Sequence, residues 1–167
     1  LFTYAFELIA EKTSDYYVSR INNDNNAIML LCRYLPLFSH ADSVNEIMNA
    51  SSRLIASLDI PKICVCLNDV PFVSLPVPAD IFAERPYRNM RGYEVTDVER
   101  GDYGPGTVFD SVSLLPPETR DHLLASDTVY LPLVQNDTYY GYVCIPSLTD
   151  NPMYYEIIRS CISHICT

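Results

Sequence analysis

The sequence is poor in several residue types, and their scarcity excludes whole classes of function. In 167 residues it has no tryptophan, five glycines and three histidines, and its 11 basic side chains are outnumbered by 21 acidic ones, giving a formal net charge of −10. A surface this negative repels the phosphates of nucleic acids and the headgroups of anionic lipids. No apolar run approaches the ~20 residues that a membrane-spanning helix needs. We therefore expect neither nucleic acid nor membrane as a partner.

Two sequence signals are also missing. The turn Gly101-x-x-Gly104-x-Gly106 is too short, too acidic and too interrupted by proline to cradle a phosphate group. The chain starts at Leu1 without a basic-then-apolar leader, and a helix-like segment runs to its last residue. This organisation is typical of a module within a longer protein.

The six cysteines lie almost entirely within apolar runs, as in Ile63-Cys64-Val65-Cys66-Leu67. Free cysteine behaves as a small buried hydrophobe, so this placement indicates core positions in a reducing cytosol rather than a disulfide framework. The pattern Cys161-x-x-His164-x-Cys166 lacks the four ligands of a zinc site. The acidic stretch around Asp97 lacks the ligand spacing of a calcium loop. We therefore predict a cytoplasmic domain without a metal site.

Helical patterns dominate the first third of the chain. Hydrophobic residues make up 49% of the sequence, which predicts one domain with a substantial core. Apolar residues recur at helical spacing over residues 1–20, over 27–35 and in a third segment that begins near Ser39–Ser43 and runs to about Leu58. The polar run Asn22–Asn26 is expected to break the first helix, and Pro36 to end or bend the second. These patterns divide the chain into an N-terminal connecting helix, residues 1–26, and a domain of residues 27–167.

From Lys62 onward the pattern changes from helical to extended. Lys62–Asn68 is apolar on both faces, as in a central strand, and the proline-rich Val70–Pro86 is expected to form a loop. The segments that follow are a strand over Tyr87–Val98 with a bulge at Gly92, an extended stretch over Val108–Leu115, a short helix over Pro116–Ala125, a hairpin of Thr128–Val134 and Tyr139–Ile145, and a helix over Met153–Cys166. Strands grouped between terminal helices predict an α+β domain with an antiparallel sheet.

The hairpin and its surroundings carry a resemblance to a known family. Tyr130-Leu131-Pro132-Leu133-Val134, a polar turn and Tyr140-Gly141-Tyr142-Val143 are similar to the paired strands of a GAF domain. Phe109–Pro116 and Tyr155–Arg159 extend the resemblance to the GAF-like segments of bacterial multidomain signalling proteins, which carry diguanylate cyclase or DNA-binding output domains. The resemblance covers roughly Ala41 to Cys166. It implies a central antiparallel sheet with the N- and C-terminal helices packed on one face and a ligand pocket on the other.

The function that this resemblance implies is that of a non-catalytic sensory or regulatory domain. It would bind a small ligand or a neighbouring domain of the same chain and relay the change through its terminal helices, as a homodimer. A dimerising connector without a ligand and a thiol redox enzyme are the two alternatives. None of the six cysteines is followed by histidine and the Asn-Lys-x-Phe-Asp-Glu signature is absent, so neither bilin nor cyclic nucleotide is implied, and the cofactor remains unknown.

The resemblance also places the ligand, between the sheet and the segment Val70–Leu115. Aromatic and arginine side chains of this segment are the candidate ligand-binding residues: Phe72, Phe82, Tyr87, Arg88, Arg91, Tyr93 and Phe109. Arg85, Arg88 and Arg91 form the close cluster of positive charge in this segment, which either holds an anionic ligand group or lies at a solvated strand edge. For the homodimer, we expect the terminal helices, residues 1–21 and 153–166, to pack near each other through apolar stripes that include Ile158.

Overall fold

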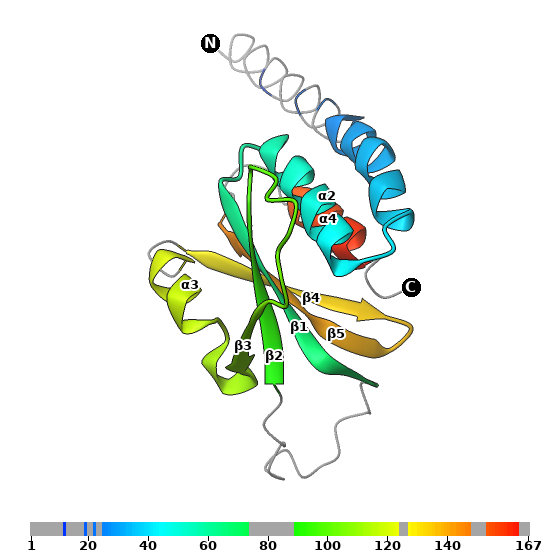
Figure 1. Cartoon of the computed structure of the whole chain (residues 1–167). Helices are drawn as coiled ribbons and strands as arrows, with labels where there is room; N and C mark the ends of the chain where they lie inside the picture. Colours follow the sequence, from blue (N-terminus) through cyan, green and yellow to red (C-terminus); the bar gives the residue numbers. More distant parts are fainter. Residues whose placement is uncertain are drawn as a thin grey trace, which may run out of the picture.

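A five-stranded antiparallel sheet lies at the centre of the described part of the protein (Figure 1). The computed structural model describes residues 25–73, 89–123, 127–147 and 153–163, together with Lys12, Ser19 and Asn22. The strand order is β3-β2-β1-β5-β4, with β1 (Lys62–Val73), β2 (Asn89–Thr96), β3 (Thr107–Asp110), β4 (Thr128–Gln135) and β5 (Thr138–Pro146). The helices are α2 (Val44–Ala56), α3 (Pro117–Leu123), α4 (Met153–Ile162), the short 3-10 helix η1 (Ser111–Ser113) and a helix over residues 25–39. The predicted α+β class is confirmed.

One face of the sheet, the helix face, is covered by helix 25–39, α2 and α4. Side chains of all three helices share one buried cluster with the sheet, and alternate residues of β1 such as Ile63 and Val65 point into it. Phe38, Met48 and Ile158 are among its fully buried members. N-terminal and C-terminal helical segments thus lie on the same side of the sheet, as expected. Of residues 1–21 in the predicted helix pair, only Lys12 and Ser19 are described, and both are helical.

The opposite face, the α3 face, has a smaller core. The even-numbered residues of β1, Cys64 and Cys66, pack there with Met90, Phe109, Tyr142 and Cys144 beneath Leu115 and Leu123. The Tyr142 hydroxyl donates a 2.6 Å hydrogen bond to the carbonyl oxygen of Leu114. The chain between β3 and β4 therefore covers the sheet face that the helices leave open. The sequence prediction placed this cover in Val70–Leu115; only Leu114 and Leu115 at its end contribute to it, and the rest of the cover comes from α3, while residues 74–88 lie outside the described part of the chain.

The β4–β5 hairpin follows the predicted pattern closely. Its two-residue turn, Asn136-Asp137, has positive φ values of 48° and 61°, as a type I′ turn requires. Leu131 and Leu133 are buried on the helix face. Pro132, which donates no ladder hydrogen bond, lies in β4 at the edge of the sheet. A register shift against β5 follows directly, between Leu133 and Val134, so this proline lies both on an edge strand and beside an irregularity.

Four local predictions need correction. Asn22, Asn25 and Asn26 are helical, and helix 25–39 continues past Pro36 to residue 39 instead of ending there. The loss in helix propensity is a few tenths of a kcal/mol per residue. It is small beside the free energy gained by burying Tyr34 and Phe38 in the cluster of the helix face. Strand β1 extends to Val73, through Pro71, with a register shift against β5 between Leu67 and Phe72 that accommodates the proline.

The fourth correction concerns Gly92, where a bulge was predicted. β2 pairs with β1 in unbroken register from Asn68↔Met90 to Lys62↔Thr96, so Gly92 lies in a regular ladder. A Cβ at this position would overlap the side chain of Pro116, the residue before α3. Glycine is needed here for the close approach of the covering segment and not for an irregular strand.

Candidate functional site

A cavity of about 360 Å³ opens beside the outer edge of β2. We call it the edge cavity. Its walls come from three places: β2 itself, the β2–β3 connection (residues 97–106) and the start of α3. The lining residues are Gly92, Tyr93, Glu94, Arg100, Tyr103, Pro105, Gly106, Thr107, Glu118 and Thr119.

The cavity exists because β3 is short. β3 pairs only with Asn89–Gly92, so among the described residues no strand covers the outer edge of β2 from Tyr93 to Thr96. The β2–β3 connection instead passes over α2 and returns at Pro105 (Figure 1). There the carbonyl oxygen of Pro105 accepts hydrogen bonds from Tyr93 Oη at 3.3 Å and Arg91 Nη1 at 3.0 Å. The connection and β2 thus enclose a space at the sheet edge that a longer β3 would fill.

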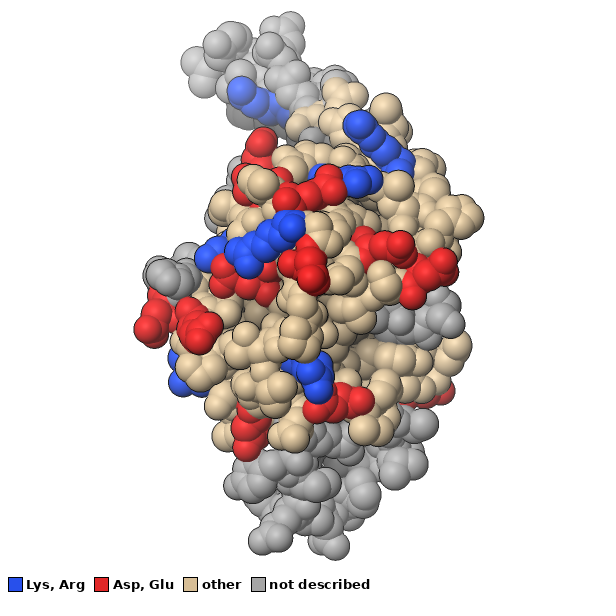
Figure 2. Space-filling model, viewed as in Figure 1, with Lys and Arg blue, Asp and Glu red and all other residues tan. Residues whose placement is uncertain are grey.

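The floor of the edge cavity carries an ion-pair triad. Glu94 Oε1 lies 3.2 Å from Lys62 Nζ and 3.6 Å from Arg100 Nη2. The Glu94 and Lys62 side chains are 28% exposed and the Arg100 side chain is 50% exposed. On the face seen in Figure 2, acidic and basic side chains lie next to one another over α2 and the β2–β3 connection. One carboxylate shared by two cations leaves the triad with an excess positive charge, in a protein whose net charge is −10.

The α3 wall contributes a carboxylate and a buried hydroxyl. Glu118 lies in the first turn of α3 and is exposed, and no ion pair or hydrogen bond joins its carboxylate to another described residue. Thr119 is only 5% exposed, and its backbone N–H donates to the carbonyl oxygen of Pro116. Burial of Leu115 and Leu123 in the core of the α3 face fixes this wall against the sheet.

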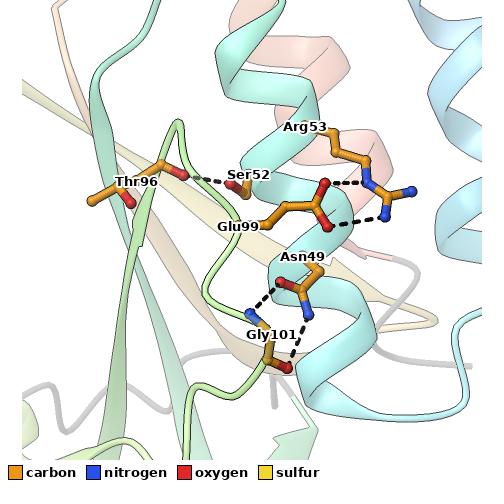
Figure 3. A network of polar contacts seen from close by, with 6 residues as sticks. All are labelled: Asn49, Ser52, Arg53, Thr96, Glu99 and Gly101. Atoms are coloured by element: carbon orange, nitrogen blue, oxygen red, sulfur yellow. Dashed lines mark hydrogen bonds and ion pairs between the residues drawn. The ribbon is translucent and has the colours of Figure 1, made fainter.

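The other side of the β2–β3 connection is bonded along α2 (Figure 3). Asn49 forms two hydrogen bonds with the backbone of Gly101, one through its Nδ2 and one through its Oδ1. Ser52 Oγ donates to the carbonyl oxygen of Thr96 at 2.6 Å, and Arg53 binds both carboxylate oxygens of Glu99 at 2.7 and 2.9 Å. We call these contacts, with those of Asn45 described next, the α2 ladder.

Asn45 adds the last pair of bonds to the ladder. Its Nδ2 donates to Asp102 Oδ1 at 3.1 Å, and its Oδ1 accepts from the Tyr103 backbone N–H at 3.0 Å. The Gly104 N–H and Asn45 lower the pKa of Asp102, and the hydrogen bonds from Arg53 lower that of Glu99. A carboxyl whose folded-state pKa is depressed stabilises the fold above its ordinary pKa and loses this effect as the pH falls. The ladder is therefore weakened in acid.

A second cavity, of about 260 Å³, lies between the end of helix 25–39 and α2. Leu37 and His40 line one side of it, and Asn49, Arg53 and Glu99 of the α2 ladder line the other. The residues that hold the β2–β3 connection therefore also face the N-terminal helix. This places the ladder between the edge cavity and that helix.

The buried cysteines form a separate group on the α3 face. Cys64 Sγ and Cys66 Sγ are 3.6 Å apart, and Cys144 is the β5 residue paired with Cys64. The contact with Cys66 and burial raise the pKa of Cys64 far above the ordinary value. The contact with Cys144 and burial likewise raise the pKa of Cys66, against a lowering contribution from Cys64. On α4, burial raises the pKa of Cys161 to about 12. A protonated, buried thiol is a poor nucleophile, so the geometry offers the redox alternative no reactive group here. Of the five described cysteines, Cys32 alone is exposed, so the predicted core position is wrong for this residue.

Of the candidate ligand-binding residues, Tyr93 lines the edge cavity. Phe109 is buried in the core of the α3 face. Arg91 forms a 2.7 Å ion pair with Asp69 beside the cavity, so its charge is already partnered. Phe72 pairs with Tyr139 in the sheet, and its side chain lies outside the described part of the structure. Phe82, Tyr87, Arg88 and the nearby Arg85 also lie outside it.

Sequence reasoning did not select the charged residues of the edge cavity. Arg100, Glu94 and Glu118 come from three segments that are adjacent only in the folded chain. The one usable signal was the turn Gly101-x-x-Gly104-x-Gly106, which has positive φ at each glycine. The sequence tests this turn only against the pattern of a phosphate-binding loop, whereas in the structure Gly106 is part of the cavity wall.

Comparisons with known protein families, with curated proteins and with solved structures give no match. Within the described ranges, no helix has the length and apolar character needed to cross a membrane. In the same part of the chain, no three His, Cys, Asp or Glu side chains are grouped to hold a metal ion. His164 and Cys166 of the Cys-x-x-His-x-Cys pattern lie outside the described residues. Function must therefore be argued from the geometry of the cavity and its surroundings.

Proposed function

We propose that this chain is a non-catalytic sensory or regulatory domain of a cytoplasmic bacterial signalling protein. In this proposal a small ligand occupies the edge cavity, and the change is passed to the terminal helices and on to a neighbouring domain of the same chain. The GAF resemblance of the sequence agrees with this assignment. The observation that carries the proposal is the double role of the β2–β3 connection, which forms one wall of the edge cavity and is bonded to α2 on its other side.

The route from ligand to helices is short. A ligand that contacts Arg100 or Tyr103 acts on the residues next to the ladder positions Glu99, Gly101 and Asp102. α2 shares its buried cluster with helix 25–39 and α4, and densely packed elements transmit small displacements because their interior does not compress. If the β2–β3 connection has two arrangements, a ligand shifts the equilibrium between them only by the difference in its affinity for the two. The two walls of the cavity, on separate elements, are where such a difference can arise.

The relay is tested by hydrogen–deuterium exchange on the purified chain, after a thermal-shift screen with free amino acids, carboxylic acids, nucleosides and purines. We expect at least one compound to raise the melting temperature, because a ligand that prefers the folded state stabilises it. That compound should alter amide exchange in α2 and helix 25–39. Asn49→Ala should keep the ligand affinity but reduce the change in exchange in helix 25–39 at least twofold.

Arg159→Ala is the matched control, since Arg159 forms an exposed pair with Glu156 on α4, away from the ladder. It should leave both affinity and exchange as in the unmutated chain. A screen in which no compound shifts the melting temperature favours the connector alternative. A ligand that binds without any change in helical exchange refutes the relay.

A homodimer is the second part of the proposal. The stripe on α4 that was expected to form the dimer contact is buried within one copy, since Ile157, Ile158, Cys161 and Ile162 belong to the core. Exposed apolar side chains lie instead on helix 25–39, where Met29 is 70% and Leu37 39% exposed. These two residues are two turns apart on the same side of the helix. We therefore assign the dimer contact to this side.

Met29→Glu should raise the dissociation constant of the dimer at least tenfold. It should not lower the melting temperature, because Met29 does not belong to the core. Sedimentation equilibrium with and without the substitution measures this change. Asn25→Glu adds the same charge one turn earlier and is the control. A larger fraction of this variant than of Met29→Glu should be dimeric at the same concentration. An unmutated chain that remains monomeric at high micromolar concentration rejects the dimer.

A further inference from the structure

The edge cavity presents both signs of charge from different walls. Arg100 belongs to the β2–β3 connection, and its guanidinium has one ionic contact within the described residues, the 3.6 Å approach to Glu94. A guanidinium has five N–H donors, so most of its hydrogen-bonding capacity is unused. Glu118 belongs to α3, and its carboxylate has no partner among the described residues. The two groups line the same space.

The charges around the cavity balance. Lys62 and Arg100 supply two positive charges, and Glu94 and Glu118 supply two negative ones. A nucleotide or another polyanion would bring its phosphates toward two carboxylates in a protein of net charge −10. A simple amine would meet Lys62 and Arg100. A molecule that carries one positive and one negative charge is matched to this site. Each of its charged groups meets a side chain of opposite charge, and no charge of the ligand is left without a partner.

The remaining lining is suited to a compact organic molecule. The rings of Tyr93 and Tyr103 supply apolar wall, and burial raises the pKa of both phenols, which keeps them neutral. Thr107 and Thr119 add hydroxyl groups. At about 360 Å³ the cavity lies at the lower end of the range for small-molecule sites, roughly 300 to 1,000 Å³. A folded peptide or a dinucleotide is too large for it.

We infer that the ligand of the edge cavity is a free amino acid, whose carboxylate binds Arg100 and whose ammonium group binds Glu118. This inference rests on the proposed sensory function and names its ligand class. The bound amino acid joins the β2–β3 connection to α3, and its side chain lies against the tyrosine rings. Because Arg100 follows Glu99 in the chain, the carboxylate acts directly beside the Arg53–Glu99 pair of the α2 ladder.

Isothermal titration calorimetry on the full 167-residue chain tests the ligand class. The probes are the twenty L-amino acids and, for each that binds, its N-acetyl derivative and its α-carboxamide. The derivatives lack the ammonium charge and the carboxylate charge, respectively. We expect at least one free amino acid to bind, and each derivative to bind at least tenfold more weakly, the fold-change of losing one charge-assisted hydrogen bond.

Two variants locate the contacts. Glu118→Gln is isosteric and lies at an exposed position. It should weaken binding of the amino acid at least tenfold without changing the affinity for its N-acetyl derivative. Arg100→Gln should weaken binding of the amino acid by a similar factor. Glu94 keeps an ionic partner in this variant, because Lys62 still pairs with it. Asp121→Asn is the matched control on α3, because Asp121 is exposed and does not line the cavity. It should leave the affinity unchanged.

The outcomes separate the ligand class from the sensory function. If a carboxylic acid or an amine alone binds as tightly as the amino acid, or if Glu118→Gln has no effect, the inference of a zwitterion is wrong while the sensor proposal stands. If an amino acid binds as described but exchange in helix 25–39 does not change, the ligand class is right and the relay is wrong. If no compound of any class binds, both are wrong.

Discussion

Substitution of Gly141 by alanine is expected to unfold the domain or to reduce its free energy of unfolding by at least about 3 kcal/mol. Gly141 lies in β5 opposite Leu67 of the central strand. Its φ is +152°, and an added Cβ would overlap the carbonyl oxygen of Cys66. A backbone atom cannot move away as a flexible side chain can. The β1–β5 ladder would separate at the middle of the sheet, where both faces are buried.

Urea denaturation followed by circular dichroism measures this loss. Gly104→Ala is the matched control, since Gly104 also has a positive φ, +61°, but no atom lies within 4 Å of an added Cβ. There the cost is the backbone strain alone, about 1–2 kcal/mol. Equal losses at the two positions would show that the contact with Cys66 does not decide the effect. An unchanged midpoint for Gly141→Ala would contradict the β1–β5 register itself.

Ile158→Asp is expected to abolish folding of the single chain. Ile158 is 0% exposed and lies in the cluster that joins α4 to the sheet and to α2. The buried cluster around it consists of hydrophobic side chains, so the new carboxylate would be buried without a partner, at a cost of about 4 kcal/mol or more. That is a large part of the roughly 5–15 kcal/mol that stabilises a typical domain. One-dimensional NMR should show the collapsed dispersion of an unfolded chain.

Met153→Asp is the control on the same helix, because Met153 is 41% exposed and lies in the first turn, where an acidic residue is favourable. It should leave the spectrum dispersed. If the Ile158→Asp chain is folded but monomeric, α4 is a dimer contact after all. The structure predicts instead that any loss of assembly in this variant follows from unfolding.

The sequence was most informative where local chemistry decides structure. Asn136-Asp137 between two alternating runs identifies the hairpin turn, because both residues tolerate positive φ. Ser43 marks the start of α2, and its hydroxyl accepts a hydrogen bond from the backbone N–H of Glu46. Pro132 marks an edge strand because it has no N–H to donate. Each of these features depends on a few neighbouring residues.

Local patterns failed where distant contacts outweighed them. The asparagines near residue 25 favour a turn, but the helix that contains them continues because Ala27, Tyr34 and Phe38 after them are buried in the cluster of the helix face. Pro71 was expected to exclude a strand, yet pairing with β5 extends β1 through it. Gly92 was interpreted as a bulge, although the reason for glycine is Pro116, more than twenty residues later in the chain.

The sequence by itself determined the α+β class, the hairpin, the acidic composition and the burial of four of the five described cysteines, since these features follow from composition, periodicity and turn chemistry. The edge cavity was decided by the tertiary structure alone. Its position depends on where β3 stops pairing with β2, and its charges come from Glu94, Arg100 and Glu118, which no spacing in the sequence relates to one another. Strand register and the path of the β2–β3 connection over α2 bring these groups together. Both are set by burial and hydrogen bonds between segments far apart in the chain.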